Sequence, residues 1–107
     1  MIKLIAILYK RPDLSREAFW KHWQEKHAPL AAKLPGLRKY CINPAIALPG
    51  SASEPPFDGV AELWFDSVEA YRAAFAAPEG QAVRADSPNF LDASCSSSIV
   101  AEEHAIV

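Results

Sequence analysis

Hydrophobic residues gather in four segments that have the composition of β-strands. Residues 2–10 (IKLIAILYK) are mostly apolar, which is typical of a central strand, and residues 59–66 (GVAELWFD) alternate between two faces. Residues 37–46 predict a strand that lies at a sheet edge or bends, because Pro44 cannot donate a ladder hydrogen bond. Residues 94–105 begin polar and become apolar, and they predict the last strand.

The first helix is predicted over residues 16–27, directly after Ser15, which is a good N-cap. Pro29 lacks the N–H that a helix interior needs, and it restrains the residue before it. The helix should therefore end or kink near His27. A short helical piece over residues 29–34 can then begin at Pro29.

A second helix is predicted after the third strand, with Asp66 or Ser67 as its cap. Pro78 interrupts this helix, and the SerPro pair at 87–88 ends its continuation. Residues 47–58 are rich in Pro, Ser and Gly and predict a loop, which we expect to be the most mobile internal segment.

The predicted order β-α-β-β-α-β is typical of an α+β, ferredoxin-like fold, with a four-stranded antiparallel sheet and both helices on one face. A chain of 107 residues is expected to form a single domain over residues 1–107. Such a sheet leaves one face and two edges uncovered, and packing against a second copy would cover them. We therefore expect a homodimer.

Charge and composition argue against several classes of protein. The formal net charge is −2 and no basic run occurs, which argues against nucleic acid and against an anionic membrane surface as partners. The N-terminal apolar run lacks a cleavage site and is too short to span a bilayer, so no export signal is expected. Cys41 and Cys95 lack C-x-x-C spacing, which fits a reduced, cytoplasmic protein.

The stretch FWKHWQEKHAPL (residues 19–30) carries the main chemical candidates. On a helical wheel His27 lies within the aromatic arc of this stretch, whereas His22 lies on its flank and should be exposed. The two histidines are about 140° apart on an ideal helix, so they cannot bind one metal as an i, i+4 pair would. No metal site is expected.

His27 is subject to two opposed influences on its pKa. Burial among tryptophans disfavours the imidazolium, whereas a position in the last turn of a helix favours it. A histidine balanced in this way can act as a general acid or base near neutral pH. A buried histidine with a purely structural part in the core remains the other interpretation of the same pattern.

Five further residues complete the predicted substrate pocket around His27. Glu62 stands out because a carboxylate within an apolar strand must be paired or protonated when it is buried. It can equally face a dimer interface and pair there with Arg38 or Lys39. Aromatic side chains would give the pocket its apolar lining. The predicted substrate-binding residues are Trp20, Trp23, Tyr40, Glu62 and Trp64.

Five blocks occur in order over almost the whole chain: FWKHWQEKHAPL, LPGLRKY, FDGVAELWFDS, a D-x-x-x-F-L-D segment beginning at Asp86, and EEHAIV. Together they resemble the EthD family. The resemblance implies a dimeric α+β barrel, in which two ferredoxin-like subunits pack sheet to sheet and each holds a pocket between sheet and helices. It also implies that His27 is the family's most recognisable histidine and that His104 matches the one in its terminal segment.

The resemblance does not imply one reaction, because the wider superfamily includes cofactor-free monooxygenases, muconolactone-type isomerases, polyketide cyclases and haem-handling enzymes. We expect an enzyme without a cofactor, of the oxidoreductase, monooxygenase, isomerase or cyclase type. His27 would transfer a proton on a small hydrophobic carbonyl, lactone or aromatic compound. The alternative is a non-catalytic binding or accessory protein for an oxygenase degradation system. Haem binding through His27 is a third hypothesis.

Overall fold

The computed structural model describes residues 1–107, and its elements follow the predicted β-α-β-β-α-β order. The strands are β1 (Ile2–Leu8), β2 (Lys39–Pro44), β3 (Gly59–Phe65) and β4 (Ser97–Glu102). The helices are α1 (Arg16–His22), α2 (Ala28–Ala31), α3 (Val68–Ala76) and α4 (Pro78–Asp86). A π-helical turn (Trp23–His27) joins α1 to α2, and a 3-10 turn (Ser87–Asn89) follows α4.

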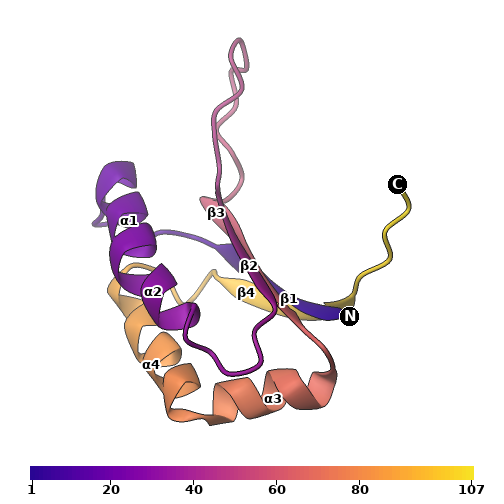
Figure 1. The fold of residues 1–107 in the computed structure, drawn as a ribbon. Coiled ribbons are helices and arrows are strands. Elements are labelled where there is room, and N and C mark those ends of the chain that lie inside the picture. The colour runs from indigo at the N-terminus through magenta and orange to yellow at the C-terminus, as the bar shows by residue number, and fades with distance from the viewer.

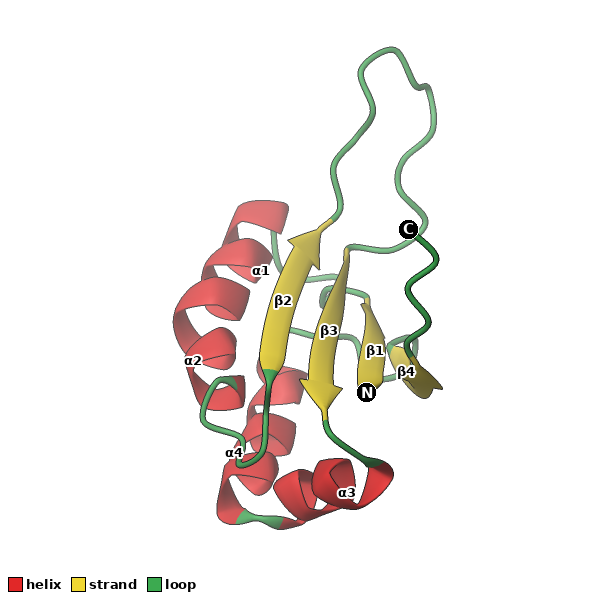
Figure 2. Cartoon of the chain, turned by 45° about the vertical axis from the view of Figure 1, so that its right-hand side comes forward, coloured by secondary structure: helices red, strands yellow, loops and turns green.

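The four strands form one antiparallel sheet in the order β2-β3-β1-β4 (Figure 2). The helices lie together on one side of this sheet, and the other side carries none (Figure 1). This arrangement confirms the predicted ferredoxin-like fold. None of the helices is long and apolar enough to cross a membrane.

The side chains that alternate toward the helices form the core. Ala61, Leu63 and Phe65 of β3 are buried, as the two-residue period of that strand predicted. Leu63 pairs across the sheet with Leu4 on one side and with Tyr40 on the other. The helical side of the sheet adds the rings of Trp23 and Phe90. Together with Phe65 of β3, these are the largest fully buried side chains.

Local signals explain where the helices begin and end. The Ser15 hydroxyl accepts a hydrogen bond from the Ala18 N–H at 3.0 Å, as expected of the cap of α1. Ser67, and not Asp66, caps α3 with its side chain. Pro78 separates α3 from α4, as predicted, because the residue before it is extended rather than helical.

The last strand is shorter than the sequence predicted. Asp92 organises residues 92–96 into a turn: its carboxylate accepts from the Ser94 N–H at 3.0 Å, and its carbonyl accepts from the Cys95 and Ser96 N–H groups. A side chain that binds its own following backbone competes with strand pairing. Residues 94–96 therefore stay outside β4.

Candidate active site

The helix that carries the two histidines does not end before Pro29 but widens. The Ala28 N–H donates to the Trp23 carbonyl five residues back, which defines the π-helical turn. Pro29 then stands at the start of α2, where its missing N–H costs nothing. The wide turn thus allows the chain to pass the proline and remain helical.

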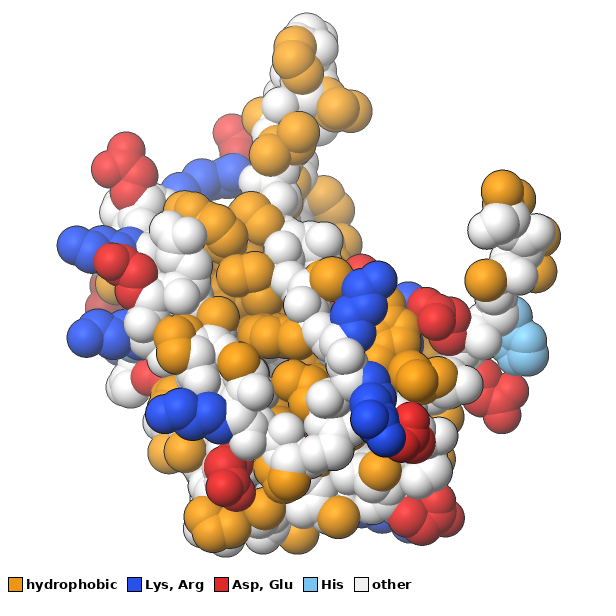
Figure 3. Space-filling model, viewed as in Figure 1, with side chains coloured by type: hydrophobic (Ala, Val, Ile, Leu, Met, Phe, Trp, Pro, Cys, Tyr) orange, Lys and Arg blue, Asp and Glu red, His pale blue; other side chains and the backbone are white.

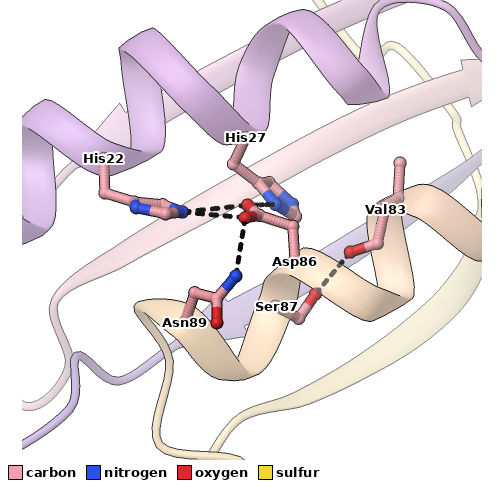
Figure 4. A network of polar contacts seen from close by, with 6 residues as sticks. All are labelled: His22, His27, Val83, Asp86, Ser87 and Asn89. Carbon is pink, nitrogen blue, oxygen red and sulfur yellow. Dashed lines mark hydrogen bonds and ion pairs between the residues drawn. The ribbon is translucent and has the colours of Figure 1, made fainter.

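This widening brings His22 and His27 onto one face, since residues five apart lie above one another in a π turn. The expectation that His22 is exposed on the flank, about 140° from His27, is therefore wrong because it assumed a regular α-helix. Both rings point at the carboxylate of Asp86, the last residue of α4 (Figure 4). They also lie against the fully buried ring of Phe90, with centroids 5.0 and 4.6 Å from it.

Asp86 is the centre of this polar cluster. Its carboxylate lies 2.8 Å from His27 Nδ1 and 3.0 Å from His22 Nε2, and it accepts a third hydrogen bond from Asn89 Nδ2 at 3.1 Å. Because a carboxylate only accepts, each histidine presents a protonated nitrogen to it. For His27 this arrangement leaves Nε2 as the nitrogen that can accept a proton, and Nε2 has no partner within the protein.

The electrostatics of the cluster keep His27 neutral and Asp86 charged. Burial lowers the pKa of His27, and Asp86 offsets only part of this effect. Burial also tends to raise the pKa of Asp86, but the hydrogen bonds from Asn89, His22 and His27 outweigh it, so the pKa lies below its ordinary value. At neutral pH the pair therefore consists of an uncharged imidazole and a carboxylate.

His27 lines an apolar cavity of about 240 Å³ between the sheet and the helices. The volume is below the ~300 Å³ at which pockets for drug-sized ligands begin. The floor is built from inward side chains of β1 and β3, and the only Lys, Arg, Asp or Glu that lines the cavity is Arg84. Its guanidinium is exposed and donates to the carbonyl of Phe75.

Trp23 and Tyr40, both predicted to bind substrate, line the same cavity as His27. The Trp23 ring is fully buried, and its Nε1 has no hydrogen-bond partner. Burial raises the pKa of Tyr40 to about 12, an effect that the nearby Trp23 N–H slightly opposes although the two groups do not form a hydrogen bond. The Tyr40 hydroxyl is thus protonated at any ordinary pH.

Trp20, which the sequence grouped with His27, lies outside the cavity. Its ring packs edge-on against Trp23 at a centroid distance of 5.6 Å. It borders a separate surface depression beside Pro44 and Asp58. Its contribution to the site is to support the Trp23 ring from behind.

Glu62 and Trp64 are also separated from His27, because they lie on the opposite face of the sheet from Ala61, Leu63 and Phe65 of β3. Glu62 pairs with Lys3 at 3.0 Å rather than with Arg38 or Lys39, and Arg38 instead pairs with Asp66. The Trp64 indole donates to Glu103 at 3.0 Å. These contacts belong to the outer face of the sheet and not to the cavity.

The residue that sequence reasoning missed is Asp86, which it noted only within the D-x-x-x-F-L-D block. A signal was present: an aspartate at the C-terminal end of a helix opposes the helix dipole and needs donors nearby. His104, in contrast, is exposed and pairs only with Glu102 of the same segment. The site therefore consists of a histidine–aspartate pair beside a small cavity that also contains an indole N–H and a phenol.

The chain is thus a ferredoxin-like α+β protein with a cavity between its sheet and its helices. The family model for the EthD domain matches residues 11–94, and the chain belongs to that family. It is 34% identical over 86 residues to an uncharacterized 11.0 kDa protein from the thcB-thcC intergenic region of Rhodococcus erythropolis, covering 80% of this chain and 81% of that protein.

Two solved structures show the same architecture. An EthD family protein from Bacillus halodurans C-125 is 33% identical, with a TM-score of 0.82 over 97% of this chain and 99% of that one. A dimeric ferredoxin-like protein of unknown function from Thermobifida fusca YX is 18% identical, with a TM-score of 0.71 over 92% and 87%. The second likeness supports the fold alone.

Proposed function

We propose that this protein is an enzyme that transfers a proton on a small hydrophobic compound, with His27 as the catalytic base and no tightly bound cofactor. The observation that carries the proposal is the His27–Asp86 pair at the wall of an apolar cavity. Asp86 holds the proton on Nδ1, so Nε2 can take a proton from a bound ligand. Asp86 then stabilises the imidazolium that forms. This assigns the reaction to proton transfer, as in isomerases and cyclases.

His22 provides a matched control for this proposal. It shares Asp86 with His27 but does not line the cavity. His27→Gln should lower the rate by about 10²–10⁴-fold, the usual contribution of a general base. His22→Gln should change the rate only a few-fold. The rate can be followed as exchange of the α-protons of 2-indanone for deuterium by NMR, which requires no knowledge of the natural substrate.

The pH dependence of the same exchange separates a base from a structural residue. The rate should fall on the acid side with an apparent pKa below 6.5, because burial lowers the pKa of His27. Asp86→Asn should move this limb to still lower pH, because it removes the group that raises the pKa. Equal rates in wild type and His27→Gln would refute the proposal. Ligand binding without exchange above buffer would instead establish a binding or accessory protein.

We also propose that the protein is a homodimer that packs through the uncovered face of its sheet, and that it is cytoplasmic. Ile99 on β4 is 62% exposed, which is unusual for a large apolar residue within a sheet. The β2–β3 loop and the C-terminal segment project from the body and carry further exposed hydrophobic atoms (Figure 3). Among them, Ile46 and Ile106 are 74% and 90% exposed. A second copy would cover these surfaces.

A further inference from the structure

The cavity contains two hydrogen-bond donors that no acceptor of the protein satisfies. Trp23 Nε1 is buried and has no partner, and an indole nitrogen can only donate. The Tyr40 O–H donates to no group of the protein; its oxygen lies near the Trp23 N–H, and burial raises its pKa to about 12, so the hydroxyl stays protonated. A buried donor without a partner costs about 1–3 kcal/mol, so its position demands an explanation.

The indole N–H cannot turn away to find another partner. The far edge of its ring lies against Gly59, where an added Cβ would be only 2.6 Å from the ring. Phe19 and Trp20 pack against the same ring at centroid distances of 5.5 and 5.6 Å. The N–H is therefore held in place beside the Tyr40 hydroxyl and the cavity.

We infer that Trp23 and Tyr40 form the binding site for the carbonyl oxygen of the substrate, which is an apolar, enolisable ketone or related carbonyl compound. Two adjacent donors, the indole N–H and the phenol O–H, suit a single oxygen atom that carries two lone pairs. Apart from His27, the rest of the lining is largely apolar, with Arg84 and four serines (Ser87, Ser96, Ser97 and Ser98) as its polar residues, so most of the ligand is apolar too. This inference rests on the proposed function for its chemistry, but the binding site itself can be tested separately.

The two donors and His27 complete one balanced step. His27 Nε2 takes a proton from the carbon next to the carbonyl, and the electrons of that C–H bond form the C=C bond of an enolate. The carbonyl oxygen gains the negative charge, which the Trp23 N–H and the Tyr40 O–H stabilise as fixed donors. The imidazolium, paired with Asp86, returns the proton to a carbon of the same molecule. No oxidant or reductant is consumed.

The binding test compares 2-indanone with indane, a hydrocarbon of the same shape that lacks the oxygen. Trp23→Phe keeps an aromatic ring but removes the donor, and Trp64→Phe is the matched control because Trp64 does not line the cavity and its indole donates to Glu103 instead. Trp23→Phe should weaken ketone binding about two- to tenfold, the effect of one neutral hydrogen bond, and should change indane binding much less. Tyr40→Phe should act in the same direction and serves if Trp23→Phe does not fold.

The carbonyl stretching frequency of bound 2-indanone gives a direct second readout. It should be lower in wild type than in Trp23→Phe, and it should be unchanged in His27→Gln and Trp64→Phe. Equal losses of ketone and indane binding, or a frequency that Trp23→Phe leaves unchanged, would overturn the inference. A shifted frequency in a wild-type protein that shows no proton exchange would support the oxygen site and refute only the proposed function.

Discussion

Gly59, the first residue of β3, lies against the Trp23 ring, so replacing it by alanine tests how firmly this wall of the cavity is packed. A Cβ at this position would lie 2.6 and 2.7 Å from two atoms of the Trp23 ring and 3.0 Å from the Asn43 carbonyl oxygen. Carbon atoms in contact stay about 3.5–4.0 Å apart. The overlap is therefore about 1 Å, so the fully buried indole has to shift, and the cavity that it lines is the space beside it.

Forcing a methyl group into a packed core costs about 1–3 kcal/mol. For a domain of about 100 residues, each kcal/mol lowers Tm by about 4–8 °C, so Gly59→Ala should lower Tm by roughly 5–20 °C. The urea midpoint should fall while the m-value stays constant. Below the transition, 2-indanone should bind more weakly because the indole N–H is displaced. Circular dichroism melts and titration calorimetry measure the two effects.

Gly50→Ala is the control for this experiment. Gly50 has a φ of +82° and no atom within 4 Å of an added Cβ, so its replacement adds only backbone strain of about 1 kcal/mol. In a Trp23→Phe background, which removes the clashing ring atoms, Gly59→Ala should cost less and Gly50→Ala should cost the same. An undiminished cost of Gly59→Ala in that background would refute the argument that Gly59 is required by the indole.

Four further predictions concern other parts of the structure. Stability toward urea should fall as pH drops below about 6.5. The pKa of His27 is lower in the folded protein than in the unfolded chain, so the unfolded chain binds the proton first. In His27→Gln, stability should depend less on pH in this range. A second loss of stability should begin near pH 4, where protonation of Asp86 breaks the hydrogen bonds that lower its pKa. The Asp86→Asn variant should not show this second loss. Gly80→Ala should lower Tm strongly, since its Cβ would lie 2.6 Å from backbone carbonyl oxygens that cannot rotate away. Ile99→Asp should yield monomers in sedimentation velocity, and an unchanged dimer would contradict an interface on this face of the sheet.

The fold was predictable because its signals are local. The cap at Ser15, the break at Pro78 and the two-residue alternation of β3 each depend on a few neighbouring residues, and all three recur in the structure. The start of the last strand was not predictable in the same way. The turn around Asp92 and the apolar residues that follow it compete for the same segment, and composition alone does not show which prevails.

The site was predictable only in part, because its geometry depends on contacts between distant residues. The position of His27 among aromatic residues followed from the helical period, and Trp23 and Tyr40 do line a cavity with it. Asp86 lies 59 residues further along the chain, and no spacing rule connects it to His27. Glu62 and Trp64 point to the other face of the sheet. A carboxylate in an apolar strand shows that it must be paired or protonated, but it does not show which face of the sheet the helices cover.

The π-helical turn links the backbone to the chemistry. A regular helix through residues 16–31 would present only one of the two histidines to Asp86, leaving the carboxylate with fewer donors and a higher pKa. With His22 and Asn89 also donating, Asp86 remains charged and resists taking the proton from His27 Nδ1. The part-buried carboxylate therefore faces a neutral His27 ring until that ring accepts a proton from the ligand, and only then does His27 present a full opposite charge to it. An interaction that strengthens as the reaction proceeds lowers the barrier and does not merely bind the ligand.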